Sequence, residues 1–334
     1  MPLFLALLQR ETAGDPARAA RVLEGLRAYQ EATRPPAPAP MPVIAETGGA
    51  MLRDYGGAGP IILFVPSLIN PPRVLDLGER SLLRWLADRG RRVLLLDWGA
   101  PDEARQNLSV AGHIEHILLP LMRGLDEPVD LVGYCLGGTM ALAAAQLGPA
   151  RSVATVAAPW RFSGFPEEGR ADLARLWRDA APVVERLGVL PMEALQSAFW
   201  SLDPARTVAK FAALAAMNDE GRATFVALED WANDGPPLAG AAARELFEDF
   251  FAADLPGRGV WRVAGETIDP ARLAVPFLNI VSTSDRIVPA ASATPAGERL
   301  DLEQGHVGMV VGSRARETLW EPLGAWLSRV SPDC

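Results

Sequence analysis

One cysteine in this chain has the surroundings of a catalytic nucleophile. The segment Gly133-Tyr134-Cys135-Leu136-Gly137-Gly138 matches the nucleophile-elbow pattern G-x-S-x-G, with cysteine in place of serine. The pattern needs small residues two before and two after the nucleophile, because a strand and a helix approach closely at that turn. An apolar strand-like run precedes Cys135 and a small-residue helical pattern follows it. This context favours a nucleophile over a buried structural cysteine.

A cysteine nucleophile needs a base, and the chain contains only three histidines. His306 lies in a glycine-flanked turn near the end of the chain, which is where the order nucleophile, acid, histidine places the base. His113 and His116 lie together on a predicted helix before the elbow. No third metal ligand accompanies them, so we interpret them as part of a solvated helix face and expect no metal site.

The orienting acid is expected between the nucleophile and the base, in the loop after a late strand. Asp285 fits this position because it follows the apolar run LNIVSTS. Asp97 ends another predicted strand at the same sheet edge, but it precedes the nucleophile, so we expect it to bind its own loop. An oxyanion hole would use the backbone N–H of Leu136 and a second N–H from Leu68 or Ile69.

The segments around these residues alternate between strand and helix. Continuous apolar runs predict buried parallel strands, and apolar residues at helical spacing predict the helices between them. The order β-α-β-α-β-α-β predicts a mostly parallel sheet covered on both faces. The predicted segments are Pro60–Leu68, Ser81–Gly90, Arg91–Gly99, Ser109–Arg123, Pro128–Gly138, Thr139–Gly148 and Ser152–Pro159, with strands returning at Val260–Gly265 and Pro276–Asp285.

Two other regions flank or interrupt this pattern. Residues 1–42 predict an N-terminal helix and a stiff linker, Pro35–Pro40. The core is expected at 43–159 and 259–334. Residues 160–258 read as helical throughout and predict a cap over the carboxyl edge of the sheet, where ligands bind. Within the cap, Phe199 and Trp200 are expected either to line a substrate tunnel above Cys135 or to pack inside the cap.

Composition limits the function. The net charge of -9 and the pI of about 5.0 argue against a broad nucleic-acid surface. Two cysteines, Cys135 and Cys334, cannot form a disulfide framework, which favours a reducing, cytoplasmic setting. The apolar start MPLFLALLQR is too short to span a bilayer. Lys210 is the only lysine among 32 Lys and Arg residues, which we attribute to coding bias.

The chain resembles the polyhydroxyalkanoate synthases, especially the short class III catalytic subunits. The resemblance runs from about Met51 to Leu327, on the strings VPSLINPPRVLDL, LLLDWGAPD, GYCLGGT, LNIVSTSDRIVP and GHVGMVVGSRARETLW. It implies an α/β-hydrolase fold with an inserted helical cap. It also implies a catalytic Cys135, Asp285 and His306, the residues chosen above from pattern and order alone.

The resemblance implies an acyltransferase that polymerises (R)-3-hydroxyacyl-CoA through a Cys135 thioester and releases coenzyme A. No separate cofactor is expected, because coenzyme A arrives with the substrate. The implied partners are a second copy of the chain or a non-catalytic synthase subunit, together with the polymer granule surface. The alternatives are a thioesterase or an intracellular polyester depolymerase of the same fold, and a non-catalytic granule-binding protein.

Overall fold

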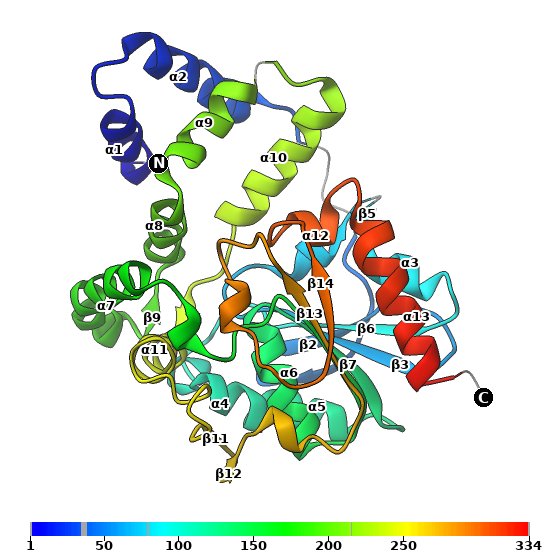
Figure 1. Cartoon of the computed structure of the whole chain (residues 1–334). Coiled ribbons are helices and arrows are strands. Elements are labelled where there is room, and N and C mark those ends of the chain that lie inside the picture. Colours follow the sequence, from blue (N-terminus) through cyan, green and yellow to red (C-terminus); the bar gives the residue numbers. More distant parts are fainter. Residues whose placement is uncertain (1, 35–38, 79, 215, 333–334) are drawn as a thin grey trace.

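The computed structural model of the chain describes residues 2–34, 39–78, 80–214 and 216–332 (Figure 1). Eight strands form one sheet in the order β1-β2-β6-β3-β7-β8-β13-β14. Strands β6, β3, β7, β8, β13 and β14 are parallel, whereas β1 and β2 form an antiparallel hairpin that pairs with β6. Their bounds are β1 Val43–Thr47, β2 Ala50–Asp54, β3 Ile61–Val65, β6 Arg92–Asp97, β7 Val129–Tyr134, β8 Ala150–Val156, β13 Phe277–Ser282 and β14 Glu298–Leu302.

The central strands are buried on both faces, as their continuous apolar runs predict. In β3 the side chains alternate between two hydrophobic clusters, with Ile61, Leu63 and Val65 on one side and Ile62 and Phe64 on the other. The first cluster lies under α6 (Leu136–Leu147) and α5 (Leu119–Arg123). The second lies under α3 (Leu82–Ala87) and α13 (Glu321–Val330). The sheet is therefore the middle layer of a three-layer core.

Three strand assignments differ from the sequence expectation. The hairpin β1–β2 and the edge strand β14 were not expected. The side chains of β1 and β14 are largely exposed, and β2, although it buries Ala50 and Leu52, also lacks a continuous apolar run. The prediction that Val260–Gly265 forms a strand of the main sheet is also wrong. Its only strand residues are β11 (Arg262–Val263), which pairs with β12 (Glu266–Thr267) in a separate two-stranded ribbon.

The segment between β8 and β13 carries the expected helices, and it also contains a small ribbon. Strand β9 (Val189–Leu190) pairs with β10 (Leu238–Ala239), so the segment is not helical throughout. Such two-residue strands have no periodicity to detect. The α-helices are α7 Glu167–Leu187, α8 Met192–Leu202, α9 Pro204–Leu214, α10 Asp219–Asn233 and α11 Gly240–Arg244, and the π-helix η5 (Glu245–Ala252) follows α11.

The N-terminal segment packs on the cap helices. It forms two helices, α1 (Pro2–Glu11) and α2 (Pro16–Glu31), and α2 lies along α9 (Figure 1). A Cβ on Gly25 would lie 1.9 Å from the carbonyl oxygen of Phe211, so glycine permits this close approach. Of the expected proline linker, residues 35–38 lie outside the described residues. The cap and the N-terminal helices therefore share one small hydrophobic cluster.

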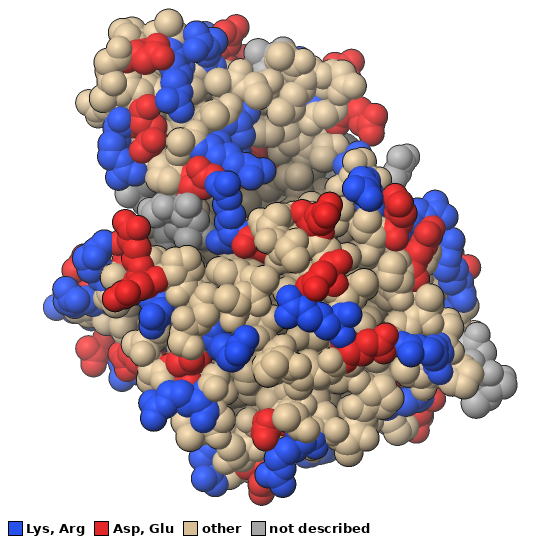
Figure 2. Space-filling model, in the orientation of Figure 1, with Lys and Arg blue, Asp and Glu red and all other residues tan. Residues whose placement is uncertain are grey.

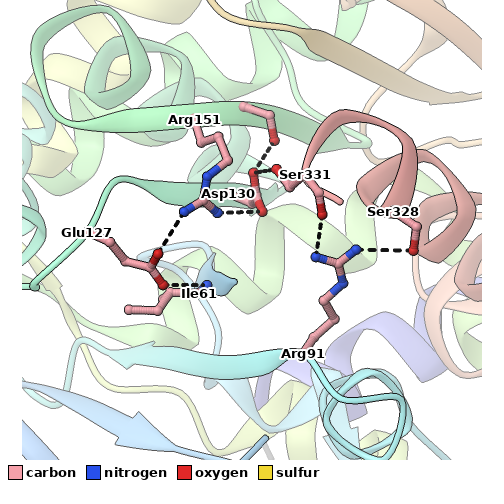
Figure 3. A network of polar contacts seen from close by, with 8 residues as sticks. Ile61, Arg91, Glu127, Asp130, Arg151, Ser328 and Ser331 are labelled. Atoms are coloured by element: carbon pink, nitrogen blue, oxygen red, sulfur yellow. Dashed lines mark hydrogen bonds and ion pairs between the residues drawn. The ribbon is translucent and has the colours of Figure 1, made fainter. Parts of the chain in front are cut away.

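A buried polar network lies around the start of β7, whereas the elbow follows the end of this strand. Figure 3 shows the network. Asp130, at the start of β7, is fully buried, and its Oδ1 accepts hydrogen bonds from the hydroxyls of Ser152 at 2.7 Å and Ser331 at 2.6 Å. Arg151 donates to its Oδ2 at 3.2 Å. Arg91 donates to the Ser331 carbonyl at 2.7 Å. The network thereby joins the end of the chain to the sheet.

Asp130→Asn should destabilise the protein, because an amide cannot accept all of these hydrogen bonds and the buried donors would lose their partner. We expect a loss of about 1–3 kcal/mol in the free energy of unfolding. Urea unfolding would measure it as a lower midpoint with an unchanged slope. Asp301→Asn is the matched control, because its ion pair with Arg299 is half exposed. An equal midpoint for both variants would contradict this role for Asp130.

Candidate active site

Cys135 occupies a strained turn between β7 and α6. Its backbone φ of 56° and ψ of −132° lie in a region that residues other than glycine rarely adopt. Two hydrogen bonds hold the turn: the Cys135 N–H donates to the Val156 carbonyl at 3.0 Å, and the Gly138 N–H donates to the Cys135 carbonyl at 2.8 Å. The thiol is partly exposed, whereas the strand behind it is buried. The turn therefore presents this side chain at the carboxyl edge of the sheet.

Close packing explains the three glycines of the elbow. A Cβ on Gly133 would lie 2.4 Å from the Cα of Gly138, and one on Gly138 would lie 2.4 Å from the Cβ of Ala158. A Cβ on Gly137 would lie 2.1 Å from the Val65 carbonyl oxygen at the end of β3. The glycines thus bring the elbow, the helix after it and the loop after β3 into direct contact.

His306 and Asp285 come together as the sequence order suggested. Nδ1 of His306 lies 2.6 Å from Oδ2 of Asp285, and both residues are only 7% exposed. The other carboxylate oxygen of Asp285 accepts the N–H groups of Ile287 at 2.7 Å and Val288 at 3.0 Å. These bonds fix the carboxylate, and the carboxylate fixes the imidazole through Nδ1, which leaves Nε2 for Cys135.

The charges around His306 favour its protonated form. Burial alone would lower the pKa of His306, but the negative charge of Cys135 and hydrogen bonds with Asp285 and Cys135 outweigh burial and raise this pKa to about 10. The Tyr134 ring packs 4.9 Å from the imidazole, and its hydroxyl donates to the His306 carbonyl at 3.1 Å. Burial, reinforced by the nearby negative charges, raises the Tyr134 pKa well above its ordinary value. A neutral Tyr134 therefore packs beside an imidazolium, an arrangement suited to a thiolate nucleophile.

The other two histidines lie outside this group, and the expectation of a solvated face is wrong for one of them. His116 is exposed, but His113 is 1% exposed and packs edge-on against Trp98, with ring centroids 5.7 Å apart. Burial lowers the His113 pKa to about 4, so this side chain is neutral. The helix α4 (Val110–His113) contacts α11. Hydrophobic periodicity in the sequence does not show which distant helix covers a helix face.

Asp97 binds its own loop, as expected, through the N–H of Gly99 at 3.2 Å. It also pairs with Arg53 of β2, whose Nε lies 2.7 Å from Oδ2. The antiparallel hairpin that carries Arg53 was not expected from the sequence. This ion pair engages Oδ2 of Asp97, and the Gly99 N–H binds its Oδ1.

The predicted oxyanion donors lie around the elbow, and their role stays a prediction. Leu136 is the first residue of α6, where N–H groups have no partner within the helix. The Ile69 N–H donates to the Ser67 hydroxyl at 3.1 Å, so it is used inside its own loop. Of the two candidates for the second donor, this leaves Leu68.

A cavity of about 300 Å³ opens above Cys135 and His306. Both predicted cap residues, Phe199 and Trp200, line it. Trp200 also packs on Phe4 of α1 with ring centroids 5.6 Å apart and an edge-on geometry. Trp200 therefore does both: it forms part of the cavity wall, and it packs against the N-terminal segment.

Sequence reasoning missed the charged part of this cavity. Lys210 of α9 and Glu229 of α10 line it, and the Lys210 Nζ lies 2.6 Å from Glu229 Oε1. Helical periodicity places both residues on cap helices but does not show that the two helices face each other here. The one available signal was the isolation of Lys210 as the only lysine of the chain.

The fold and the elbow define the class of protein. The structure resembles those of a thermophilic esterase from Thermogutta terrifontis, with a TM-score of 0.56 and 18% identity over 88% of this chain and 98% of that chain, and of a monoacylglycerol lipase from Paleococcus ferrophilus, with a TM-score of 0.53 and 17% identity over 84% and 99%. At this identity the likeness shows the fold alone. The predicted α/β-hydrolase fold is thereby confirmed.

The sequence relatives are more specific than the fold. The chain matches no protein-family model. It is 29% identical to the poly(3-hydroxyalkanoate) polymerase subunit PhaC of Allochromatium vinosum over 80% of each chain, and 28% identical to that of Synechocystis over 80% of this chain and 77% of the relative. The PhaC of Haloferax mediterranei is 28% identical over 81% of this chain. The match covers 59% of the length of that relative. The predicted resemblance to polyhydroxyalkanoate synthases is confirmed.

Proposed function

We propose that this chain is an acyltransferase that polymerises (R)-3-hydroxyacyl-CoA into polyhydroxyalkanoate through a thioester on Cys135. The observation that carries the proposal is a cysteine at the elbow, beside a buried His306–Asp285 pair, in a chain related to polymerase subunits. A cysteine thioester keeps the acyl group reactive, whereas a serine ester would hold it in a more inert form. The reaction needs no separate cofactor, because coenzyme A enters and leaves with the substrate.

The first half of the proposed reaction acylates the enzyme. The Cys135 thiolate attacks the thioester carbonyl of the acyl-CoA, and the carbonyl oxygen takes the negative charge. The N–H of Leu136 and a second N–H in the loop after β3, assigned to Leu68, would stabilise that oxyanion. The C–S bond to coenzyme A then breaks, and the leaving thiolate takes the proton of the His306 imidazolium. The products are acyl-Cys135, neutral His306 and free coenzyme A.

The second half transfers the acyl group to a hydroxyl. Neutral His306 removes the proton of a hydroxyl on a second hydroxyacyl unit or on the growing chain, and that oxygen attacks the Cys135 thioester. An ester forms, the bond to sulfur breaks, and the Cys135 thiolate returns beside the imidazolium. Asp285 holds the imidazole in the orientation that both halves need. Water in place of the hydroxyl would yield free acid, so exclusion of water by the cap decides between polymer and hydrolysis.

The direct test uses purified protein and 3-hydroxybutyryl-CoA. We expect coenzyme A release accompanied by polyester, with less free 3-hydroxybutyrate than polymer. Release matched by free acid would instead identify a thioesterase, and no release with retained binding to polyester would identify a binding protein. The same assay repeated with a class III partner subunit, and with added polyester granules, tests the expected partners.

Among the residues that the structure describes, none of the helices combines the length and apolar character required for crossing a bilayer. A cytoplasmic location at granules remains a prediction that imaging of a fluorescent fusion in polymer-producing cells would test.

Trp200→Ala should change the fate of the acyl-enzyme. Removing this cavity wall admits water to the Cys135 thioester, so the ratio of free hydroxyacid to polymer should rise several-fold while acylation persists. Because Trp200 also packs on Phe4, the thermal midpoint should fall as well.

Phe4→Ala is the matched control for this variant. It removes the same aromatic contact from the side of α1, and Phe4 is not among the residues that line the cavity. We expect a lower thermal midpoint with an unchanged product ratio. If both variants shift the ratio equally, packing rather than the cavity wall controls water entry.

A further inference from the structure

The only lysine of the chain lies in the active-site cavity. Lys210 is one of 32 Lys and Arg residues, and all the others are arginine. A coding bias toward arginine explains why lysine is rare but not why the one lysine lines the cavity that holds Cys135 and His306. Lysine carries a compact ammonium with three donors, whereas arginine is a broad planar fork. The position therefore points to a requirement for the smaller cation.

Lys210 is held in place by a nearly buried carboxylate. Its Nζ lies 2.6 Å from Oε1 of Glu229, whose side chain is 10% exposed, while the Lys210 side chain is 31% exposed. The ammonium also lies 5.5 Å from the centre of the Phe211 ring. The two charges come from different helices, α9 and α10, so the pair exists only in the folded cap.

The cavity around this pair has polar and apolar parts. Thr207 and Gln196, both almost buried, line it together with Lys210 and Glu229. Val74, Leu228 and Ile287 are among its apolar lining residues. An ion pair in a confined space can offer an N–H donor and a carboxylate acceptor to the same ligand. A purely aliphatic chain against it would desolvate both charges without replacing their hydrogen bonds.

We propose that Lys210 and Glu229 form a subsite that recognises the oxygen atoms of the hydroxyacyl chain, with the ammonium donating to a carbonyl or hydroxyl oxygen and the carboxylate accepting a hydroxyl proton. This inference rests on the proposed function, because it assumes that the acyl group on Cys135 occupies this cavity. It makes the pair a determinant of specificity for hydroxylated over plain acyl chains. A site built to hydrogen-bond a substrate oxygen rejects the analogue that lacks it.

The experiment compares acyl thioesters of equal chain length. One member of each pair carries hydroxyl or ester oxygens beyond the thioester group, and the other does not. Single-turnover acylation of Cys135 is followed by coenzyme A release and by the mass of the intact protein. The short pair is 3-hydroxybutyryl-CoA and butyryl-CoA. The long pair is the CoA thioester of the hydroxybutyrate dimer and octanoyl-CoA. We expect the wild type to prefer the oxygen-bearing member of at least one pair by roughly tenfold to a hundredfold.

The variants Lys210→Met and Glu229→Gln should reduce that preference to within about threefold, chiefly by slowing the oxygen-bearing substrate. Asp230→Asn is the matched control: this neighbour of Glu229 binds Tyr29 and Arg34 of the N-terminal segment and does not line the cavity. It should keep the wild-type preference. If a single variant fails to fold because it leaves a buried charge unpaired, Lys210→Met combined with Glu229→Leu removes both charges and keeps the test.

Two failures are distinguishable. If no acyl-CoA acylates the wild type, the proposed function is wrong. If acylation proceeds without preference in either pair, or if the cavity variants keep the wild-type preference, the Lys210–Glu229 subsite is wrong while the proposed function stands.

Discussion

Cys135→Ala should abolish acylation by 3-hydroxyacyl-CoA. Alanine cannot form the thioester, so we expect the rate of coenzyme A release to fall by at least about 10⁴-fold, the scale seen when a nucleophile is removed from a triad. Intact-protein mass spectrometry should detect the acyl adduct on the wild type and none on the variant. The fold should persist, since alanine has the same backbone restrictions as cysteine at a φ of 56°.

Two further variants make this result specific. Cys334→Ala should leave the rate unchanged; Cys334 lies outside the described residues and was expected to play no part in catalysis. Cys135→Gly should be equally inactive but somewhat more stable than Cys135→Ala, because glycine adopts a positive φ without strain. Substantial release of coenzyme A by Cys135→Ala would show that the nucleophile lies elsewhere.

His306→Ala should lower the rate of polymer formation by about 10²–10⁴-fold, the usual contribution of a positioned acid or base. It also removes the positive charge that pairs with the thiolate. His116→Ala, an exposed change on another helix, is the control and should match the wild type.

The wild-type acylation rate should fall as pH rises through about 10. In the proposed reaction, acylation uses the imidazolium of His306. The pKa of this group is raised to about 10, so the protonated form persists well above the ordinary value of 6.5. The same shift makes protonation favour the folded state. This stabilising contribution is complete below pH 6.5 and disappears as pH rises to about 10. A rate that declines near pH 6.5 would contradict the ion pair.

Asp285→Asn tests the origin of that shift. The hydrogen bond from His306 to Asp285 raises the His306 pKa, so an amide at this position should move the alkaline fall in rate to lower pH. It should also lower the rate by favouring the wrong orientation of the imidazole. If the rate falls but the pH profile does not move, Asp285 only orients the imidazole and does not raise the His306 pKa.

The parts of the site that depend on local geometry were predictable from the sequence. The G-x-C-x-G turn needs a tight contact between strand and helix, and the structure shows that contact as the short distances around Gly133, Gly137 and Gly138. The buried strands were also predictable, because a strand covered on both faces must be apolar along its whole length. Chain order then selected Asp285 and His306, and the structure brings these two into contact.

The exposed strands were not predictable in the same way. Strand β14 reads Glu298-Arg-Leu-Asp-Leu302 and lies at the edge of the sheet, so most of its side chains face solvent and carry no apolar run. Yet the loop after it carries His306. Pairing with β13, a non-local contact, decided the position of this candidate base.

The sequence by itself therefore determined the elbow, the three-layer core, the order of the candidate triad and the helices between β8 and β13. Only the tertiary structure decided that His113 is buried, that α1 supports Trp200 through Phe4, and that Lys210 and Glu229 meet in the cavity. The physical reason is the distance along the chain over which each effect acts. Dihedral preferences and hydrophobic period act over one or two turns, and they show which face of a helix is apolar. Which distant helix covers that face depends on packing across the whole chain, and in this protein such packing brings Trp200, Lys210 and Glu229 into the cavity wall.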